Sequence, residues 1–121
     1  MLRIRPENGA EMILRLWRGW TAPEQSAAYE QLLTEQIAPA ILDRGIPGLR
    51  DLTVLRRHPM ELDPARGSEI LTAMTFADLA AVAAFTGGDP TVSVVPPAAR
   101  ALLSRFDEHS MHYTSVARFG G

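Results

Sequence analysis

Lysine and cysteine are both missing from this chain of 121 residues, and each absence removes a class of chemistry. Without cysteine there is no thiol nucleophile, no zinc–thiolate site and no iron–sulfur cluster. Without lysine no side-chain amine can form a Schiff base. The lack of cysteine also suits a reducing compartment, so we expect a cytoplasmic protein. The abundance of alanine and arginine is typical of a bacterial genome of high GC content.

The chain also lacks a large excess of charge of either sign, and it has no long apolar run. The 12 basic and 14 acidic residues are scattered along the chain and give a net charge of −2. Because no basic cluster offers a footprint for phosphates, we expect no nucleic acid partner. No stretch approaches the roughly 20 apolar residues of a membrane helix. We therefore expect no membrane association.

The chain also contains none of the common cofactor and hydrolase motifs. Nucleotide-binding glycine loops, the P-loop, the nucleophile elbow and the zinc-protease helix are all absent from the sequence. We therefore expect neither a cofactor nor a metal. The length suits one domain over residues 1–121, with a core at about 11–116 and a loose arm at 1–9.

Alternating and helical periodicities follow one another along the first half of the chain. Residues 11–20 alternate like a strand, and Thr21 with Glu24 forms a capping box for a helix that begins at Ala22. Pro39 is expected to kink or end that helix. Its apolar positions recur at helical spacing, at Tyr29, Leu32, Leu33, Ile37 and Ile41.

The second half repeats the alternation of strands and helices. Strands are predicted at 49–57, 68–75 and 109–116, with helices at 79–85 and 98–106. Asp78 is a suitable N-cap for the first of these helices, and Gly87 and Gly88 should end it. The order βαββαβ predicts an α+β, ferredoxin-like antiparallel sheet with its helices on one face.

The first strand presents two different faces. Leu14 and Leu16 share one face, whereas Ile13, Arg15 and Trp17 share the other. We expect the uniformly apolar leucine face to lie under the helices. The opposite face, with its isoleucine and tryptophan, then has no cover within the chain, and this predicts a homodimer.

The last predicted strand contains a tyrosine and two histidines. We expect Met111 and Tyr113 on the helix-covered side, and His112 and Thr114 on the uncovered side. Side chains three apart on a strand point to opposite faces, so His109 and His112 cannot share a metal ion. In a ferredoxin-like sheet this strand lies beside the first one, which would bring His112 near Arg15.

Several segments together resemble the antibiotic biosynthesis monooxygenase family of dimeric α+β barrels. The resemblance rests on ILRLWRGWT at 13–21, Tyr29, PGLRDLTVLRR at 47–57, AAFTGGD at 83–89 and MHYTSV at 111–116. It implies a dimer with a pocket in each subunit between sheet and helices. For some members it implies cofactor-free oxygenation of quinol-like or anthrone-like compounds. Other members cleave haem, act in quinol metabolism or signalling, or have no known activity.

The chain departs from the family at positions that matter for chemistry. Haem-cleaving members use an asparagine on the first strand, an aromatic residue in the second main helix and a histidine ten residues later. Here the only asparagine is Asn8, Phe85 stands at the aromatic position and Val95 at the histidine position. The resemblance therefore does not imply haem cleavage. Anthrone-oxidising members also use a pocket asparagine, which this chain lacks.

Arg15 and His112 are the candidate catalytic residues. His112 would take a phenolic proton from a bound quinol, and Arg15 would hold the developing oxyanion. The anion would then react directly with oxygen. The alternatives are a neutralised arginine at a dimer interface and a structural histidine bonded to backbone or to a partner chain.

The candidate pocket residues are mostly aromatic. They are Trp17, Tyr29, Met74, Phe76, Phe85 and Thr114. Trp17 would stack on a flat ligand, or else lie in a dimer interface, and Tyr29 is equally compatible with a core position. The expected function is a cofactor-independent monooxygenase that acts on a small aromatic. The alternatives are a protein that binds a small hydrophobic molecule without turnover, and a purely structural dimer.

Overall fold

The computed structural model describes residues 4–6, 12–58 and 68–120, and its main feature is an antiparallel sheet. Strand β2 (Ile13–Thr21) lies between β4 (Ser68–Phe76) and the short strands β5 (Arg105–Phe106) and β6 (Met111–Thr114). Strand β3 (Leu49–Arg56) pairs with the outer side of β4. Strand β2 is therefore central, and its side chains lie where sheet and helices can enclose a site.

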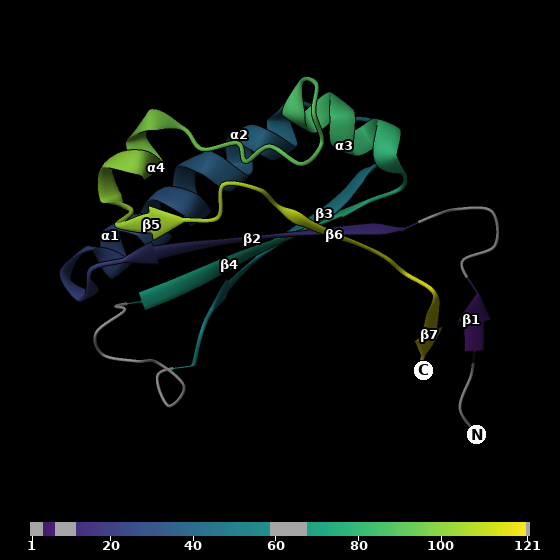
Figure 1. The fold of residues 1–121 in the computed structure, drawn as a ribbon, viewed down its shortest axis with the longest axis horizontal. Coiled ribbons are helices and arrows are strands. Elements are labelled where there is room, and N and C mark those ends of the chain that lie inside the picture. Colours follow the sequence, from purple (N-terminus) through teal and green to yellow (C-terminus); the bar gives the residue numbers. More distant parts are fainter. Residues whose placement is uncertain (1–3, 7–11, 59–67, 121) are drawn as a thin grey trace.

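All helices lie on one face of this sheet (Figure 1). The first helical segment comprises η1 (Pro23–Gln25), α1 (Ser26–Leu32), the π-helical η2 (Leu33–Ile37) and α2 (Ala38–Asp43). The second comprises α3 (Leu79–Thr86) and α4 (Pro97–Leu102). The predicted α+β, ferredoxin-like class is confirmed.

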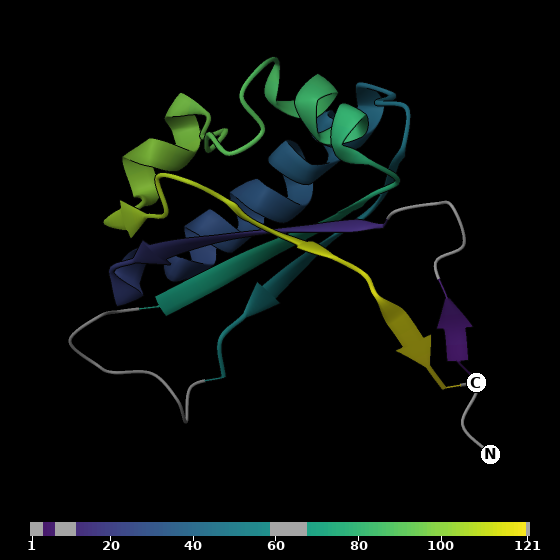
Figure 2. The same cartoon turned by 45° about the vertical axis from the view of Figure 1, so that its right-hand side comes forward.

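The two ends of the chain form a separate ribbon. Strands β1 (Ile4–Pro6) and β7 (Ala117–Phe119) pair with each other and stand away from the main sheet (Figures 1 and 2). The prediction of a loose arm at 1–9 is therefore wrong for residues 4–6, and its other residues lie outside the described ones. The predicted final strand at 109–116 is shorter in the sheet, and the chain turns after Thr114 to form β7.

The start and the middle of the first helix differ from prediction. Thr21 ends β2 instead of capping the helix, and Ala22 precedes a 3-10 turn without any side-chain cap. Pro39 does not end the helix, because a π-helical turn precedes it, in which the Ala38 N–H donates to the carbonyl of Leu33. Such wide turns absorb a disturbance of the α-helical bonding pattern. The helix therefore continues to Asp43.

The two faces of β2 are the reverse of the predicted ones. Ile13 and Arg15 are each only 3% exposed and lie beneath the helices, and Trp17 packs with them on that side. Leu14, at 36% exposure, lies with Leu16 on the open face. Both faces are apolar enough to be covered, so hydrophobicity alone does not separate them. The face under the helices is the one where the guanidinium finds carbonyl acceptors.

The faces of β6 are reversed in the same way. Met111 pairs with Leu16, Tyr113 pairs with Leu14, and both are exposed on the open face. His112 pairs with Arg15 on the helix-covered side. The predicted neighbourhood of His112 and Arg15 is therefore present, but on the opposite face.

The second helical segment follows its prediction at α3 and departs from it at α4. Asp78 accepts a hydrogen bond from the Ala81 N–H, and Gly87 ends α3 with a left-handed φ of 81°. Helix α4 is shorter than the predicted 98–106. Leu103 is already extended, and Arg105 and Phe106 join the sheet beside Trp20 and Gly19.

Two packed clusters join the helices to the sheet. One contains Ile13, Met74, Phe76, Ala81, Val82 and Phe85, and the other contains Tyr29, Leu33, Ile70 and Ala99. The pocket described below lies between them. In the described part of the chain, no helix is long and apolar enough to span a membrane.

Candidate functional site

A pocket lies between the sheet and the helices, and β2 and β4 form its floor. Arg15, Trp17, Thr72 and Met74 come from the sheet. The remaining lining residues come from the helices and from the chain around α4: Tyr29, Leu33, Ile37, Ile41, Phe85, Val94, Val95, Pro96, Ala99 and Ser110. The lining is apolar except for one guanidinium and three hydroxyls.

The pocket is narrow, with a cavity volume of about 50 Å³. A space of this size holds a few water molecules, whereas an engineered cavity that binds benzene in another protein measures about 150 Å³. An aromatic ligand therefore enters only if lining side chains move. The π-helical turn η2 supplies Leu33 and Ile37 to this lining, and such turns occur frequently at functional sites.

Five of the eight residues expected at the site line this pocket: Arg15, Trp17, Tyr29, Met74 and Phe85. Phe76 instead lies in the neighbouring core, with its ring centroid 5.9 Å from that of Phe85. Thr114 is exposed and lies outside the lining. His112 is also outside the lining and reaches the pocket only through Arg15.

Sequence reasoning missed most of the aliphatic wall and two of the hydroxyls. Leu33, Ile37 and Ile41 were placed on the apolar side of their helix, where nothing separates a pocket position from a core position. Thr72 and Ser110 belong to no motif, and only the folded chain brings their hydroxyls together.

Arg15 is the central polar group of the site. Its Nη1 donates to the carbonyl of Pro90, and its Nη2 donates to the carbonyl of Val92 at 2.9 Å. The guanidinium carbon also lies 5.4 Å from the centroid of the Phe85 ring. No carboxylate of the described residues forms a salt bridge with Arg15. Burial lowers the pKa of the guanidinium to about 10, so the group remains a cation at neutral pH.

His112 accepts a hydrogen bond from this arginine. Its Nε2 lies 3.0 Å from Nη1 of Arg15. Because arginine can only donate, Nε2 must carry the lone pair, and the proton of the neutral ring belongs on Nδ1. Burial, followed by the charge of Arg15, lowers the pKa of His112. The imidazole is therefore neutral at neutral pH, and its basic nitrogen is already engaged.

Three buried hydroxyls of the pocket have no hydrogen-bond partner. They belong to Tyr29, Thr72 and Ser110, and Thr21 carries the only other such buried hydroxyl in the described part of the chain. A buried hydroxyl without a partner costs about 1–3 kcal/mol. Tyr29 is fully buried, and burial raises the pKa of its phenol, so it stays protonated. These groups are therefore available to a ligand or to ordered water.

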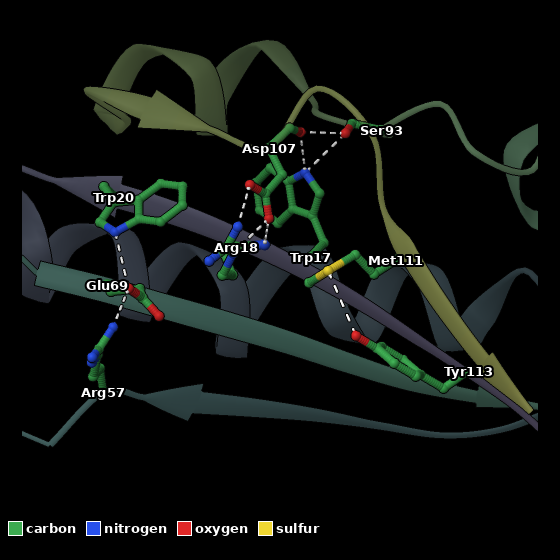
Figure 3. A network of polar contacts seen from close by, with 9 residues as sticks. All are labelled: Trp17, Arg18, Trp20, Arg57, Glu69, Ser93, Asp107, Met111 and Tyr113. Carbon is green, nitrogen blue, oxygen red and sulfur yellow. Dashed lines mark hydrogen bonds and ion pairs between the residues drawn. The ribbon is translucent and has the colours of Figure 1, made fainter. Parts of the chain in front are cut away.

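Trp17 is fixed at its polar edge. Its Nε1 donates to the hydroxyl of Ser93 at 3.0 Å and to the carbonyl of Asp107 at 2.8 Å (Figure 3). Arg15 and Trp17 thus attach the segment that contains Pro90, Val92 and Ser93 to β2. This segment leads into the part of the wall formed by residues 94–96.

The described residues contain no group of three or more histidines and carboxylates that could hold a metal ion.

Comparisons with known proteins bear on the fold. No protein-family profile matches this sequence, and no curated protein matches it. A crystal structure of a protein from Shewanella oneidensis superposes with a TM-score of 0.60 at 14% identity, over 98% of this chain and 100% of that one.

Two further crystal structures that superpose on this chain are named as oxygenases. SnoaB, a cofactor-independent oxygenase from Streptomyces nogalater, gives a TM-score of 0.51 at 19% identity, over 90% of this chain and 94% of its own. A Bacillus cereus protein, provisionally named an antibiotic biosynthesis monooxygenase, gives a TM-score of 0.51 at 14% identity, over 88% of this chain and 92% of its own. The chain therefore has the fold of the antibiotic biosynthesis monooxygenase-like structures, as the sequence resemblance predicted.

Proposed function

We propose that this protein is a cofactor-independent monooxygenase-like enzyme that acts on a small, electron-rich aromatic of the quinol or anthrone kind. One observation carries the proposal. A buried guanidinium and three buried hydroxyls lie in a single, otherwise apolar pocket, and within the described residues the guanidinium has no carboxylate partner and the hydroxyls have no hydrogen-bond partner. The likeness of the fold to a cofactor-independent oxygenase adds support.

In the proposed reaction, Arg15 stabilises the oxyanion of the bound aromatic. A preorganised cation in an apolar site favours charge that develops beside it far more than water does. The electron-rich anion then reacts with dioxygen. For an anthrone, the ring methylene takes up one oxygen atom as a carbonyl, and its two hydrogens leave with the other oxygen atom as water. This step needs no external reductant.

His112 takes a different role in this proposal from the one its sequence position suggests. Its Nε2 accepts from Arg15 and is not free to take a proton from a ligand. We propose that it positions the guanidinium. It becomes a base only if Arg15 turns away from it towards a bound anion.

We also propose that the protein is a homodimer that uses the open face of the sheet. Four side chains on that face are exposed although they are apolar or aromatic: Leu14, Leu55, Met111 and Tyr113. Exposed apolar side chains on one face of a sheet favour a subunit interface there. A second copy would cover it, as the family resemblance implies.

Oxygen consumption tests the catalytic proposal. The protein is mixed with a panel of anthrones and hydroquinones, and uptake is followed with an oxygen electrode against a buffer blank. We expect uptake that saturates with substrate and falls strongly in Arg15→Gln, whereas Arg18→Gln on the opposite face of β2 leaves it unchanged. Uptake equal to the blank for every compound would remove the catalytic proposal.

A second candidate is a binding protein that holds a small aromatic without turnover. The observation in its favour is the absence of histidine, aspartate and glutamate from the described residues that line the pocket. A general base normally lies within hydrogen-bond reach of the proton that it removes. Saturable ligand binding without oxygen uptake would favour this candidate.

A further inference from the structure

We propose that the ligand of this pocket enters as an anion, with a carboxylate or an equally acidic oxyanion on an apolar body, and not as a neutral phenol. The inference rests on the proposed use of the pocket as a ligand site. It adds the charge state of the ligand, which the oxygenase proposal leaves open.

The hydrogen-bond capacity of Arg15 is the first argument. A guanidinium has five N–H donors, and the described contacts use two on Nη1 and one on Nη2. Within the described part of the chain no hydrogen bond forms from Nε. One donor on Nε and one on Nη2 thus remain, and two donors of this kind fit the two oxygens of a carboxylate.

The burial of the charge is the second argument. Arg15 is 3% exposed, and its described partners are two carbonyls, a neutral imidazole and an aromatic ring. None of these neutralises the cation. Buried charges are normally paired with an opposite charge, because an unpaired one is strongly disfavoured in an apolar site. A ligand anion would supply the missing charge.

The lack of an available base is the third argument. Among the described residues that line the pocket, none can take a phenolic proton at neutral pH, and Nε2 of His112 is bonded to Arg15. A neutral phenol would therefore have to lose its proton without an acceptor. A ligand whose acidic group is already ionised binds to Arg15 as an anion without any proton transfer inside the pocket, and its remaining polar atoms can use the hydroxyls of Tyr29 and Ser110.

Two isosteric probes separate the charge from the shape of the ligand. Benzoate and benzamide are both planar and of similar size, but only benzoate is an anion at pH 7.5. Binding is followed in the ¹⁵N-labelled protein through the indole N–H signal of Trp17, which lines the pocket. The indole signal of Trp20, which is bonded to Glu69 outside the pocket, serves as an internal control (Figure 3).

The proposal predicts a saturable shift of the Trp17 signal, with a dissociation constant for benzoate lower than that for benzamide by about tenfold or more. Arg15→Gln should abolish this preference, and Arg15→Lys, which keeps the charge, should retain it. Arg18→Gln is the matched control, because Arg18 already pairs with Asp107 on the other face of β2. It should leave the preference unchanged.

Equal affinity for the two probes, or no shift of the Trp17 signal with either, would overturn the proposal. A preference for benzoate that survives in Arg15→Gln or disappears in Arg18→Gln would also overturn it. Oxygen uptake on neutral quinols without any preference for anions would leave the oxygenase proposal standing and remove this one. A preference for anions without oxygen uptake would support the present proposal and remove the oxygenase proposal.

Discussion

At the scale of single residues, the hydroxyl of Tyr29 links stability to ligand binding. It is fully buried and has no hydrogen-bond partner among the described residues, so its loss of hydration on folding is not offset by a hydrogen bond. We expect Tyr29→Phe to raise the free energy of unfolding by about 1 kcal/mol and to weaken ligand binding. Urea unfolding and the benzoate titration measure the two effects.

Thr21 provides the control for this prediction. Its buried hydroxyl also lacks a partner, but it lies outside the pocket lining. Thr21→Val should therefore leave the affinity for benzoate unchanged. A loss of stability in Tyr29→Phe would show that the phenol is already hydrogen-bonded in the folded protein, against this account.

His112 gives the folded protein a specific pH dependence. Its pKa is lowered in the folded state, by burial and then by Arg15, so the unfolded chain binds the proton more readily. The contribution of His112 to the free energy of unfolding is therefore fully present above its ordinary pKa near 6.5, and it is lost as the pH drops below that value. Protonation also removes the acceptor of Arg15. We expect unfolding at a lower urea concentration at pH 5.5 than at pH 7.5.

The substitution His112→Gln should remove part of this pH dependence. His109 is exposed at the surface, and His109→Gln is the matched control that should leave the dependence in place. An unchanged pH profile in His112→Gln would contradict the assigned hydrogen bond to Arg15.

Single residues were predictable from sequence where local pattern decides their position. The alternation along β2 places Arg15 and Trp17 on one face, and the strand order places His112 beside Arg15. What the pattern does not contain is which face the helices cover. That depends on the carbonyls of Pro90 and Val92, which lie 75 and 77 residues away from Arg15 and accept its donors only in the folded chain.

At the scale of elements, Gly48 lets the chain pass beneath α3. Its φ is 88°, and a Cβ added there would lie 2.8 Å from the Cβ of Ala81. Because Gly48→Ala adds backbone strain of about 1–2 kcal/mol to this collision, we expect a lower free energy of unfolding by about 2 kcal/mol or more. Thermal and urea unfolding measure the change.

Gly88 is the control for this substitution. An added Cβ there meets no atom within 4 Å, and its φ lies outside the left-handed range. Gly88→Ala should therefore change stability by less than about 0.5 kcal/mol. Equal effects at the two glycines would contradict the proposed close approach of α3.

The elements themselves were predictable in proportion to the strength of their local signals. Helix α3 has an N-cap at Asp78 and a left-handed glycine at its end, and the structure confirms the prediction of both ends. The π-helical turn η2 carries no such signal, because its residues are equally compatible with an α-helix. The early end of α4 depends on the pairing of Arg105 and Phe106 with β2, which is a tertiary effect.

At the scale of the whole molecule, the open face of the sheet has an apolar part and a polar end. At the polar end Trp20 is buried and donates to Glu69 (Figure 3). The guanidinium carbon of Arg105 lies 4.0 Å from the centroid of the Trp20 ring. This tryptophan is thus covered within its own chain, and the exposed apolar side chains of the same face lie elsewhere on it. A second copy is proposed to cover those side chains.

A charge placed on this face tests the proposed dimer. We expect Leu14→Glu to shift the protein from dimer to monomer, because a buried unpaired carboxylate opposes association. Light scattering coupled to size-exclusion chromatography at micromolar concentration measures the mass. Leu42→Glu is the control, because Leu42 is equally apolar and 54% exposed but lies on α2. A wild-type protein that is a stable monomer would contradict the dimer.

The sequence thus predicted the α+β scaffold from its order of periodicities, and the resemblance of several segments predicted the likeness to the monooxygenase fold. The pocket depends on where hydroxyls from three different segments meet, and no local pattern encodes that. The cytoplasmic location of the protein stays a prediction.

The central claim is that the space between sheet and helices is a ligand site organised by Arg15. A crystal structure of the protein soaked with benzoate tests it most directly. We predict one bound molecule in this space, with its carboxylate within hydrogen-bonding distance of the Arg15 guanidinium and the lining side chains moved apart to admit its ring. A pocket filled by its own side chains, with the hydroxyls of Tyr29, Thr72 and Ser110 bonded inside the protein, would contradict the claim.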